Sequence, residues 1–322
     1  MGKSRRIIYK IMEDKVTFIS TVLNEENTIL KFLDSIATQT RQPDEIIIVD
    51  AKSKDKTVEL IKTFSRKNKL NIKIIIKKSN RSQGRNIAIK DSQNSIICIS
   101  DAGCILDSEW LERIVAPFKN KKIDVVSGYY DVYGNSSFAK ALGAYVLVMP
   151  DRINEKQFLP SSRSMAVRKK TWEKAGMFPN NLNYSEDYLF AKNLKKIEAN
   201  FVFVKDAIVF WIPGKNLQEA FLMFLRFAKG DIEAGIIRPK VIFIFARYVG
   251  FMILIFFALL MHSIELLYII IFGFIAYLIW AVMKNIKYVK KIGGLFLLPT
   301  FQILSDIAVI TGTLSASIRK VK

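Results

Sequence analysis

Short apolar runs alternate with amphipathic segments through the first hundred residues of the chain. The apolar runs are rich in β-branched residues and predict strands over residues 16–23, 45–50, 72–76 and 95–100. Between them, apolar residues at helical spacing predict helices over residues 25–37, 53–66 and 83–90. Because strands that alternate with helices pair mainly in parallel, we expect an α/β fold with a mostly parallel sheet flanked by helices.

The rhythm becomes less regular after residue 101. Further strands are predicted over residues 124–130, 164–167, 201–204 and 207–211. Further helices are predicted over residues 107–118, 137–148, 171–175 and 186–196. We expect the helix at 137–148 to cover the functional site.

Two long apolar stretches near the end of the chain predict membrane-spanning helices. Residues 241–261 contain one interior charge, Arg247, and residues 264–283 contain Glu265 at their edge. About 20 apolar residues suffice to cross the hydrocarbon core of a bilayer. The alternative is a pair of buried core helices, but neither stretch keeps an amphipathic pattern.

A third apolar stretch, residues 292–318, is more polar, with Gln302, Asp306 and Thr313 near one helical face. It forms either a third span that packs on the first two through this face, or a re-entrant or interfacial helix. The amphipathic segment 217–234, just before the first span, is expected to lie in the membrane interface. An ordinary packed helix is the alternative for that segment.

Charge is distributed unevenly along the chain. Residues 1–235 hold 39 Lys and Arg against 27 Asp and Glu, whereas residues 236–322 hold 10 against 2. Basic residues flank the outer ends of the first two spans, which predicts a cytoplasmic location for the large domain. Three full spans would place the basic C-terminal end on the opposite side, against that rule. Nucleic acid is one explanation of the positive charge. An anionic membrane surface and phosphorylated substrates explain it equally well and agree with the predicted spans, so we expect no nucleic-acid partner.

These patterns divide the chain into a basic N-terminal tail, a soluble domain, an interfacial region and a membrane domain. The predicted boundaries are 1–15, 16–215, 216–240 and 241–322. The chain has two cysteines, and its first 14 residues lack a continuous apolar leader, which fits a reduced setting. We therefore expect a multi-pass membrane protein with its large domain on the cytoplasmic side.

Acidic residues close two of the predicted strands: Asp50 ends one and Asp101 follows another. In open α/β sheets, ligands bind outside the carboxyl ends of the strands. A carboxylate at Asp101 can hold Mg²⁺ or Mn²⁺, and the ion can in turn hold a diphosphate. A carboxylate at Asp50 can accept the imide N–H of a uracil-like base. At each position a turn or helix-cap aspartate is the alternative.

Ser185-Glu186-Asp187 opens a predicted helix with two adjacent acids. One of them can point into a site as a general base while the other faces elsewhere. The alternative is that both only complement the helix dipole.

Four residues around the start of the helix predicted at 83–90 are candidates to steer a diphosphate. They are Arg81, Gly84, Arg85 and Asn86. We expect Arg163 and Arg168 to be solvated at the surface. The single histidine, His262, lies between the predicted spans and is a poor candidate for base chemistry.

The order of these segments resembles the family-2 glycosyltransferases of GT-A fold, over roughly residues 14–240. Their common order is more specific than any one motif. The segments that carry the resemblance are residues 16–26 with the turn Asn24-Glu25-Glu26, 44–57 with Asp50, Gly84-Arg85-Asn86, Ser100-Asp101-Ala102-Gly103-Cys104, 160–179, Ser185-Glu186-Asp187, Trp211-Ile212-Pro213 and 226–231.

The resemblance implies a GT-A-type mixed sheet and an inverting glycosyltransferase, with Asp187 as the base and Asp101 as the ligand of a divalent cation. The substrate-binding residues that it implies are Asn24, Glu25, Asp50, Arg85, Asn86, Glu186 and Trp211. A core tryptophan is the alternative for Trp211. Three positions depart from the family pattern: Thr21 replaces a proline, Lys52 replaces a small residue, and Gly103 replaces the acid that usually touches the metal.

The predicted function is transfer of a sugar from a nucleotide-diphosphate sugar to a membrane-associated acceptor. That acceptor is a polyprenyl phosphate, a lipid-linked glycan or a precursor of a cell-surface polysaccharide. One alternative is a sugar-phosphate nucleotidyltransferase, which needs a Gly-rich basic loop where Asn24-Glu25-Glu26 stands. The other is a catalytically inactive, membrane-anchored module that binds sugar nucleotides, which the missing acid at Gly103 favours.

Overall fold

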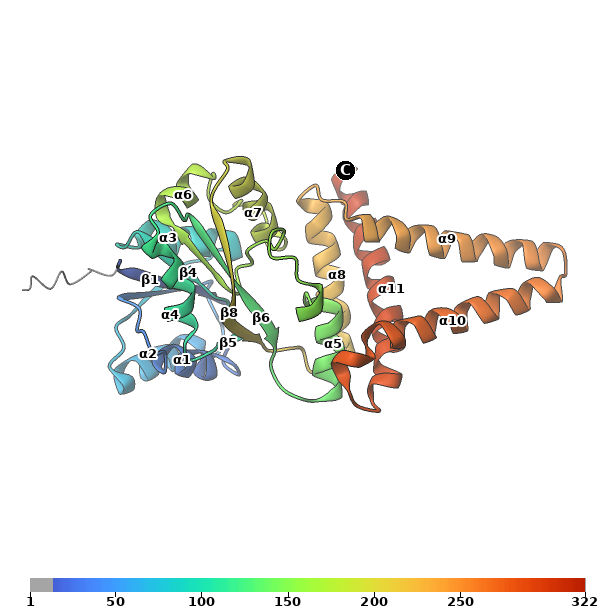
Figure 1. The fold of residues 1–322 in the computed structure, drawn as a ribbon, viewed down its shortest axis with the longest axis horizontal. Coiled ribbons are helices and arrows are strands. Elements are labelled where there is room, and N and C mark those ends of the chain that lie inside the picture. The colour runs from blue at the N-terminus through green and yellow to red at the C-terminus, as the bar shows by residue number, and fades with distance from the viewer. Residues whose placement is uncertain (1–13, 322) are drawn as a thin grey trace, which may run out of the picture.

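The computed structural model describes residues 14–321 and consists of a sheet domain followed by apolar helices (Figure 1). The first elements are β1 (Val16–Val22), α1 (Ile29–Ala37), β2 (Glu45–Asp50), α2 (Thr57–Asn68), β3 (Ile72–Ile76), α3 (Arg81–Asp91) and β4 (Ile96–Ile99). The next are β5 (Cys104–Leu106), α4 (Trp110–Val115), η1 (Ala116–Lys119), β6 (Val125–Val132), α5 (Ser137–Val146), η2 (Pro150–Arg152), β7 (Met165–Arg168), α6 (Lys169–Lys174), α7 (Glu186–Lys196) and β8 (Phe201–Trp211). The last are α8 (Leu217–Glu233), α9 (Pro239–Leu260), α10 (Ile264–Val289) and α11 (Gly294–Val321). The predicted basic tail, 1–15, lies outside the described residues except for its last two positions.

One mixed sheet has the strand order β3-β2-β1-β4-β7-β6-β8-β5. Its first four strands are parallel, β7 is antiparallel to both of its neighbours, and β6 and β8 are parallel to each other. The prediction of a mostly parallel sheet is therefore correct for the strands β3, β2, β1 and β4. The strands β7, β6, β8 and β5 form the mixed half of the sheet. Since β1 lies between β2 and β4, the carboxyl ends of these three strands share one edge.

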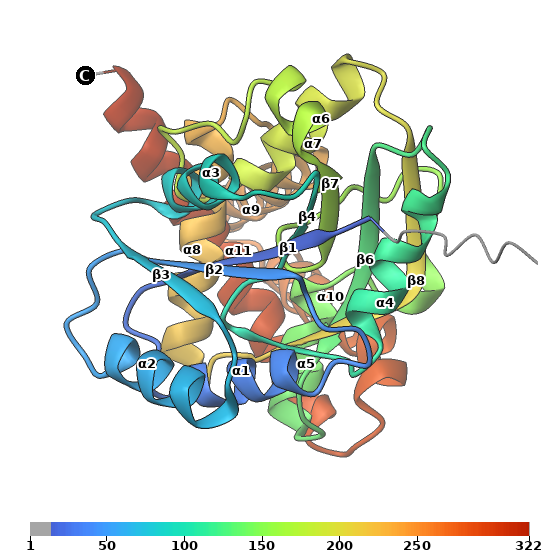
Figure 2. The ribbon, with the colours of Figure 1, turned by 90° about the vertical axis from the view of Figure 1, so that its left-hand side faces the viewer.

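Alternating side chains of the strands divide the core into two layers. Phe18 and Ile48 face α1, α2 and α4, whereas Ile19 and Ile47 face α3, α6 and α7. This follows from the two-residue period of a strand, because the central strands are apolar on both faces. Figure 2 shows helices on both sides of the sheet.

Three local predictions need correction. The strand β5 was not predicted, since three residues are too few to show a period. The strands predicted at 201–204 and 207–211 form one strand, β8, which is irregular opposite Gly128 and Tyr129. The helices α1 and α2 begin four residues later than predicted, because the preceding residues form a turn in which Asn24 Oδ1 accepts a hydrogen bond from the Lys54 N–H.

The helices α9 and α10 form a long hairpin that projects away from the sheet domain (Figure 1). Apolar side chains are exposed on them throughout, as with Phe243 at 69% and Phe272 at 74%. Both helices are long and apolar enough to cross a membrane, and α11 meets the same criterion. The prediction of apolar C-terminal spans is thus supported by length, composition and exposure.

The helix α11 differs from the hairpin in its surroundings. It runs beside α8 and α5, across the base of the hairpin (Figure 1). A Cβ on Gly312 would lie 2.7 Å from the carbonyl oxygen of Leu225, so α11 and α8 pack at backbone distance. In the most apolar stretch of α11, 33% of the residues are buried inside the protein, whereas the corresponding share is 6% in each helix of the hairpin. The helices α5, α8 and α11 therefore form a layer between the sheet domain and the hairpin.

Candidate active site

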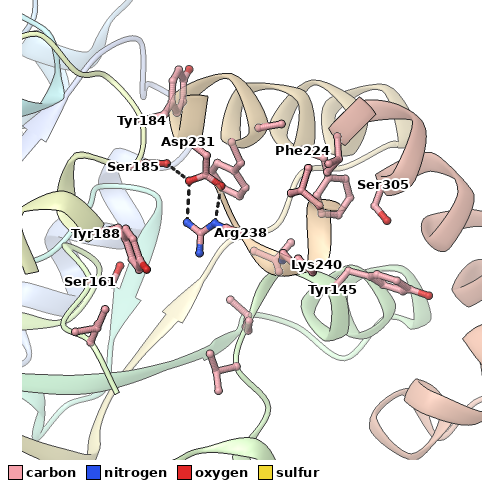
Figure 3. Close-up of a pocket in the computed structure, with 18 of the residues that line it drawn as sticks. Tyr145, Ser161, Tyr184, Ser185, Tyr188, Phe224, Asp231, Arg238, Lys240 and Ser305 are labelled. Atoms are coloured by element: carbon pink, nitrogen blue, oxygen red, sulfur yellow. Dashed lines mark hydrogen bonds and ion pairs between the residues drawn. The ribbon is translucent and has the colours of Figure 1, made fainter. Parts of the chain in front are cut away.

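A cavity of about 850 Å³ extends from the carboxyl end of β4 to the base of the helical hairpin (Figure 3). Asp101, Ser162 and Asp187 line it on the sheet side. Arg247 and Asp306 line it on the side of the hairpin. The same cavity therefore contacts both the predicted catalytic residues and the predicted membrane helices.

Arg85 organises the sheet side of this cavity from a buried position on α3. Its Nη1 lies 2.6 Å from Glu186 Oε1, and its Nη2 lies 2.7 Å from Asp101 Oδ1. Nη2 also donates to Ser162 Oγ at 2.9 Å. These contacts engage both terminal nitrogens, and Arg85 does not line the cavity, so the guanidinium positions two carboxylates; its predicted contact with a diphosphate stays a prediction.

Local sequence explains how α3 brings Arg85 to this place. Asn80 and Gln83 form a capping box, which fixes the first turn of the helix. Gly84 allows α3 to approach β1, because a Cβ there would lie 2.7 Å from Thr21 Cγ2. The helix can thus insert its arginine behind the carboxyl ends of the strands.

The two carboxylates that contact Arg85 differ in acidity. Burial opposes the charge of Asp101, but Arg85 and then Arg81 outweigh it and hold the pKa of Asp101 below its usual value. Burial raises the pKa of Glu186, and Arg85 only partly offsets this effect. Asp101 is therefore ionised at neutral pH, as a ligand of a divalent cation must be.

Asp187 lies at the first turn of α7, next to Glu186. Its Oδ2 accepts hydrogen bonds from Ser161 Oγ at 2.8 Å and from the Ser162 N–H at 3.2 Å, and its Oδ1 accepts one from the Tyr188 N–H. These contacts hold the carboxylate in the wall of the cavity. This is the arrangement that a general base needs, because a base must be held within reach of the proton that it removes.

The backbone of Ser185 sets the direction in which the chain enters α7, whose first turn contains Glu186 and Asp187. Ser185 has a positive φ of 59°, unusual for a residue with a side chain, and it directly precedes α7. Its Oγ donates to Asp231 Oδ1 at 2.8 Å, and Asp231 also accepts from Arg238 Nη2 at 2.8 Å (Figure 3). The turn that carries the two acids is thus tied to the end of α8 and the start of α9.

Asp50 is fully buried at the end of β2. Its Oδ2 accepts hydrogen bonds from the backbone N–H groups of Lys52 and Ser53, as a turn aspartate does. Its Oδ1 has no hydrogen-bond partner among the described residues. A buried acceptor without a donor is costly, so this oxygen is available for an N–H of a ligand. Asp50 does not line the cavity, and β1 separates it from β4 by two strand spacings, about 10 Å.

Asn24 and Glu25 form the turn after β1, at the same edge of the sheet. Asn24 has a φ of 57°, and its backbone N–H donates to Ser53 Oγ. Burial raises the pKa of Glu25, while its hydrogen bond from Thr28 acts in the opposite direction. Both residues border the site through this turn, but neither lines the cavity.

Asn86 and Trp211, two further predicted substrate-binding residues, also lie outside the lining of the cavity. The amide of Asn86 is saturated: its Nδ2 donates to Phe178 O and Asn180 Oδ1, and its Oδ1 accepts from the Phe178 N–H and from Trp172 Nε1. Asn86 therefore has a structural role in place of the predicted donor contact. Trp211 is partly buried and packs against the apolar clusters, and its predicted contact with substrate stays a prediction.

Two arginines that were expected at the solvated surface lie inside the protein or line the cavity. Arg163 lines the cavity, with its guanidinium 5.4 Å from the ring centre of Tyr130 and 5.7 Å from that of Trp211. Arg168 is buried and donates to the carbonyl oxygens of Ile123 and Phe118. Neither is solvated as expected: Arg163 lies just before β7 and faces the cavity, and Arg168 is the buried last residue of β7. The cluster Ser161-Ser162-Arg163 was the available signal for this part of the site.

The donor set for a divalent cation is small. Within residues 14–321 no group of three His, Cys, Asp or Glu side chains is placed to hold a metal. Asp101 Oδ2 makes one long hydrogen bond, 3.3 Å from Ser162 Oγ, and Gly103 adds no ligand. Mg²⁺ and Mn²⁺ commonly bind one or two carboxylates together with phosphate oxygens, so Asp101 fits a cation that arrives with a diphosphate.

Comparison with known proteins agrees with this geometry. The family model described as Glycosyl transferase family 2 matches residues 17–176. The glycosyltransferase GlyA of Streptococcus pneumoniae is 28% identical over 126 residues, which cover 39% of this chain and 18% of GlyA. The O-antigen chain rhamnosyltransferase RfbN of Salmonella typhimurium is 24% identical over 212 residues, which cover 61% of this chain and 65% of RfbN. The chain thus spans less than two thirds of the length of these relatives.

A solved structure resembles nearly the whole chain. It is the mannosyltransferase PcManGT from Pyrobaculum calidifontis, in complex with GDP-Man and Mn²⁺. The TM-score is 0.66 at 15% sequence identity, and the match covers 93% of this chain and 88% of PcManGT. At this identity the likeness shows the fold, a mixed sheet followed by apolar C-terminal helices.

Proposed function

Since this chain belongs to glycosyl transferase family 2 and has the GT-A fold, we propose that it is an inverting enzyme that transfers a sugar from a nucleotide-diphosphate sugar to an acceptor at the membrane. One observation carries this proposal: the carboxylates around Arg85 and the base of the apolar hairpin line the same cavity. An acceptor anchored in the bilayer can therefore reach the catalytic residues without leaving it.

The donor fits along the carboxyl edge of β2, β1 and β4. The free Oδ1 of Asp50 accepts the imide N–H of the base, next to the turn that contains Asn24. Asp101 follows β4, two strands away from β2, and would face the diphosphate through a divalent cation. Mg²⁺ or Mn²⁺ bound by Asp101 would supply positive charge to the leaving diphosphate. A complex of PcManGT contains GDP-Man and Mn²⁺, in line with this arrangement.

The acceptor hydroxyl lies at Asp187 in this proposal. Asp187 removes its proton while the oxygen forms a bond to the anomeric carbon from the face opposite the diphosphate. The bond between the anomeric carbon and the phosphate oxygen breaks, and the nucleoside diphosphate leaves with the electron pair. Ser161 Oγ and the Ser162 N–H hold the carboxylate in position for this transfer. Glu186 and Arg85 act on the geometry of the site and not on the reacting atoms.

The membrane orientation follows from the hairpin. The two ends of the hairpin that join the rest of the chain lie against the layer of α5, α8 and α11, on the side that faces the sheet domain (Figure 1). Lys287 lies in the last turn of α10, and Lys290 directly follows that helix. The positive-inside rule then places the sheet domain in the cytoplasm. With the hairpin across the bilayer, α11 lies along the membrane surface, and the basic C-terminal end stays on the cytoplasmic side. This removes the conflict that three full spans would create.

The test compares the full-length Asp187→Asn variant with wild type, using a panel of nucleotide sugars and a membrane extract as acceptor. We expect transfer to fall by about 100-fold or more, because proton removal by a positioned base contributes this much. Donor binding, followed by thermal shift with Mn²⁺, should stay unchanged. Asp206→Asn, an exposed residue of β8, is the control. Full turnover by Asp187→Asn would refute the assignment of the base.

A further inference from the structure

The side of the cavity nearest the hairpin carries an excess of positive charge. Two acids line it there, and each is already neutralised: Asp231 by Arg238 and Asp306 by Arg247. Three further cations line the same region, Arg152, Lys240 and Lys284. Among the described residues none of the three forms an ion pair with a carboxylate. We call Arg152, Lys240 and Lys284 the basal cluster.

The basal cluster is assembled from three separate elements. Arg152 ends η2, Lys240 lies in the first turn of α9, and Lys284 lies in the last turns of α10. The nearby Asp151 does not line the cavity and is paired with Lys287 and Tyr288. Like charges that converge without a counter-charge repel one another, so the fold holds these groups together at a cost. An anionic ligand would remove that cost.

Contacts with neighbouring groups orient two members of the cluster. Arg152 Nη2 donates to the carbonyl oxygen of Lys284 at 3.0 Å, and the guanidinium lies over the ring of Tyr288. The Lys284 Nζ lies 4.6 Å from the ring centre of Trp280. Lys240 and Tyr145 both line the cavity (Figure 3), and the Lys284 Nζ lies 6.0 Å from the ring centre of Tyr145. Ordinary interfacial lysines extend toward lipid headgroups, whereas Lys240 and Lys284 line the cavity that leads to Asp187.

The opposite end of the cavity restricts what part of the acceptor reacts. Asp101, Glu186 and Asp187 gather there, and a base has a function only toward a group that carries a removable proton. A lipid monophosphate used as the nucleophile is already ionised near neutral pH, so it offers Asp187 no proton to remove and would lie against the negative charge of that base. A sugar hydroxyl carries a removable proton and has no negative charge. The acceptor therefore has a hydroxyl at one end and an anionic group further toward the membrane.

We propose that the basal cluster binds the diphosphate of a lipid-diphosphate-linked saccharide, whose terminal sugar hydroxyl lies at Asp187 and whose lipid chain follows the hairpin. This inference rests on the proposed function and selects one of its three acceptor classes. Three cations match a diphosphate better than a single phosphate. The cavity has the volume of sites that enclose ligands of this size.

The first test measures binding alone, with the full chain in phosphatidylcholine nanodiscs and farnesyl diphosphate as the probe. We expect titration calorimetry to detect farnesyl diphosphate, with farnesyl monophosphate and farnesol about tenfold or more weaker. The double variant Lys240→Ala, Lys284→Ala should bind farnesyl diphosphate about tenfold more weakly, and the double variant with arginine at both positions should retain binding. The control double variant Lys229→Ala, Lys290→Ala removes two cations outside the cavity and should bind as wild type does.

Three results of the binding test would overturn the inference. The first is equal binding of farnesol and farnesyl diphosphate. The second is unchanged binding by the double alanine variant. The third is displacement of farnesyl diphosphate by phosphatidylglycerol at similar concentration, which would make the cluster a general site for anionic lipids.

The second test separates this inference from the proposed function. With a lipid-diphosphate-linked saccharide as acceptor, the double alanine variant should raise the acceptor KM about tenfold and leave the donor KM unchanged. With an octyl glycoside, which has no phosphate, the variant and wild type should transfer equally. Weaker donor binding by the variant would assign the cluster to the donor and overturn the inference. If the wild-type protein transfers sugar to none of the acceptors, the proposed function is refuted, while the result of the binding test stands.

Discussion

Arg85 Nη1 lies 2.6 Å from Oε1 of Glu186, a residue 101 positions further along the chain. The pair is buried, and the second terminal nitrogen of the same guanidinium contacts Asp101. One side chain of α3 therefore connects the end of β4 with the first turn of α7. Asp101 and Asp187, which have different proposed roles, owe their relative positions to this connection.

Arg85→Lys should destabilise the protein and reduce its activity. A lysine cannot contact two carboxylates with the planar geometry of a guanidinium, so one buried acid would lose its partner. We expect the free energy of unfolding to fall by about 3 kcal/mol, measured by denaturant unfolding in detergent. Lys73→Ala removes an exposed ion pair with Asp91 and should change it by less than about 1 kcal/mol. Wild-type stability of Arg85→Lys would contradict this role.

The contribution of Asp101 to stability should depend on pH in the acidic range. The pKa of Asp101 is lowered in the folded state from its ordinary value of 3.8, so the unfolded chain binds more protons there. Its stabilisation is thus present above about pH 4 and is lost as the pH falls through the folded value. The difference in melting temperature between wild type and Asp101→Asn should shrink from pH 6 to pH 3. Asp34→Asn, at an exposed position of α1, should show no such change.

Gly103→Asp should strengthen metal binding. A Cβ at this position would meet no atom within 4 Å, so the larger side chain fits without displacement. It adds a carboxylate two residues after Asp101, and a second oxygen ligand favours Mg²⁺ or Mn²⁺. We expect the Mn²⁺ concentration for half-maximal transfer to fall about tenfold, and Gly103→Asn to have a smaller effect. A chelator should abolish wild-type transfer, and activity that survives chelation would refute the metal role of Asp101.

Asp231→Asn should slow the reaction without weakening donor binding. Asp231 holds both Ser185 Oγ and Arg238, and Ser185 sets the direction of the turn that precedes Asp187. Loss of the charge loosens this turn, and small displacements of a base are costly. We expect kcat to fall about tenfold with the donor KM unchanged. Glu233→Gln, exposed on the same helix, is the control, and an equal loss in both variants would argue against positioning.

Gly312→Ala tests the layer formed by α8 and α11. The added methyl group would lie 2.7 Å from the carbonyl oxygen of Leu225, which is backbone and cannot move aside easily. We expect a loss of about 1–3 kcal/mol in stability, because overpacking forces the helices apart. Gly250→Ala in α9 meets nothing within 4 Å and should be neutral or slightly stabilising. Thermal unfolding of both variants decides whether this close packing exists.

The sequence by itself determined the order of strands and helices, the apolar hairpin and the positions of the acids at the ends of strands. These features are local, because apolar period and turn chemistry are set by neighbouring residues. The contiguous motifs around Asp50, Asp101 and Asp187 also belong to this group. Boundaries failed where the period was too short to read, as in the three residues of β5.

Tertiary structure alone decided how these motifs meet. The contacts of Arg85 with two acids, the inward position of Arg163 and the packing of Asn86 away from the cavity depend on contacts between distant segments. The crosswise position of α11 likewise depends on its packing against α8, because its composition alone equally allows a span. A sequence pattern states which face of an element is apolar, but not which partner covers it, since many partners bury the same area equally well.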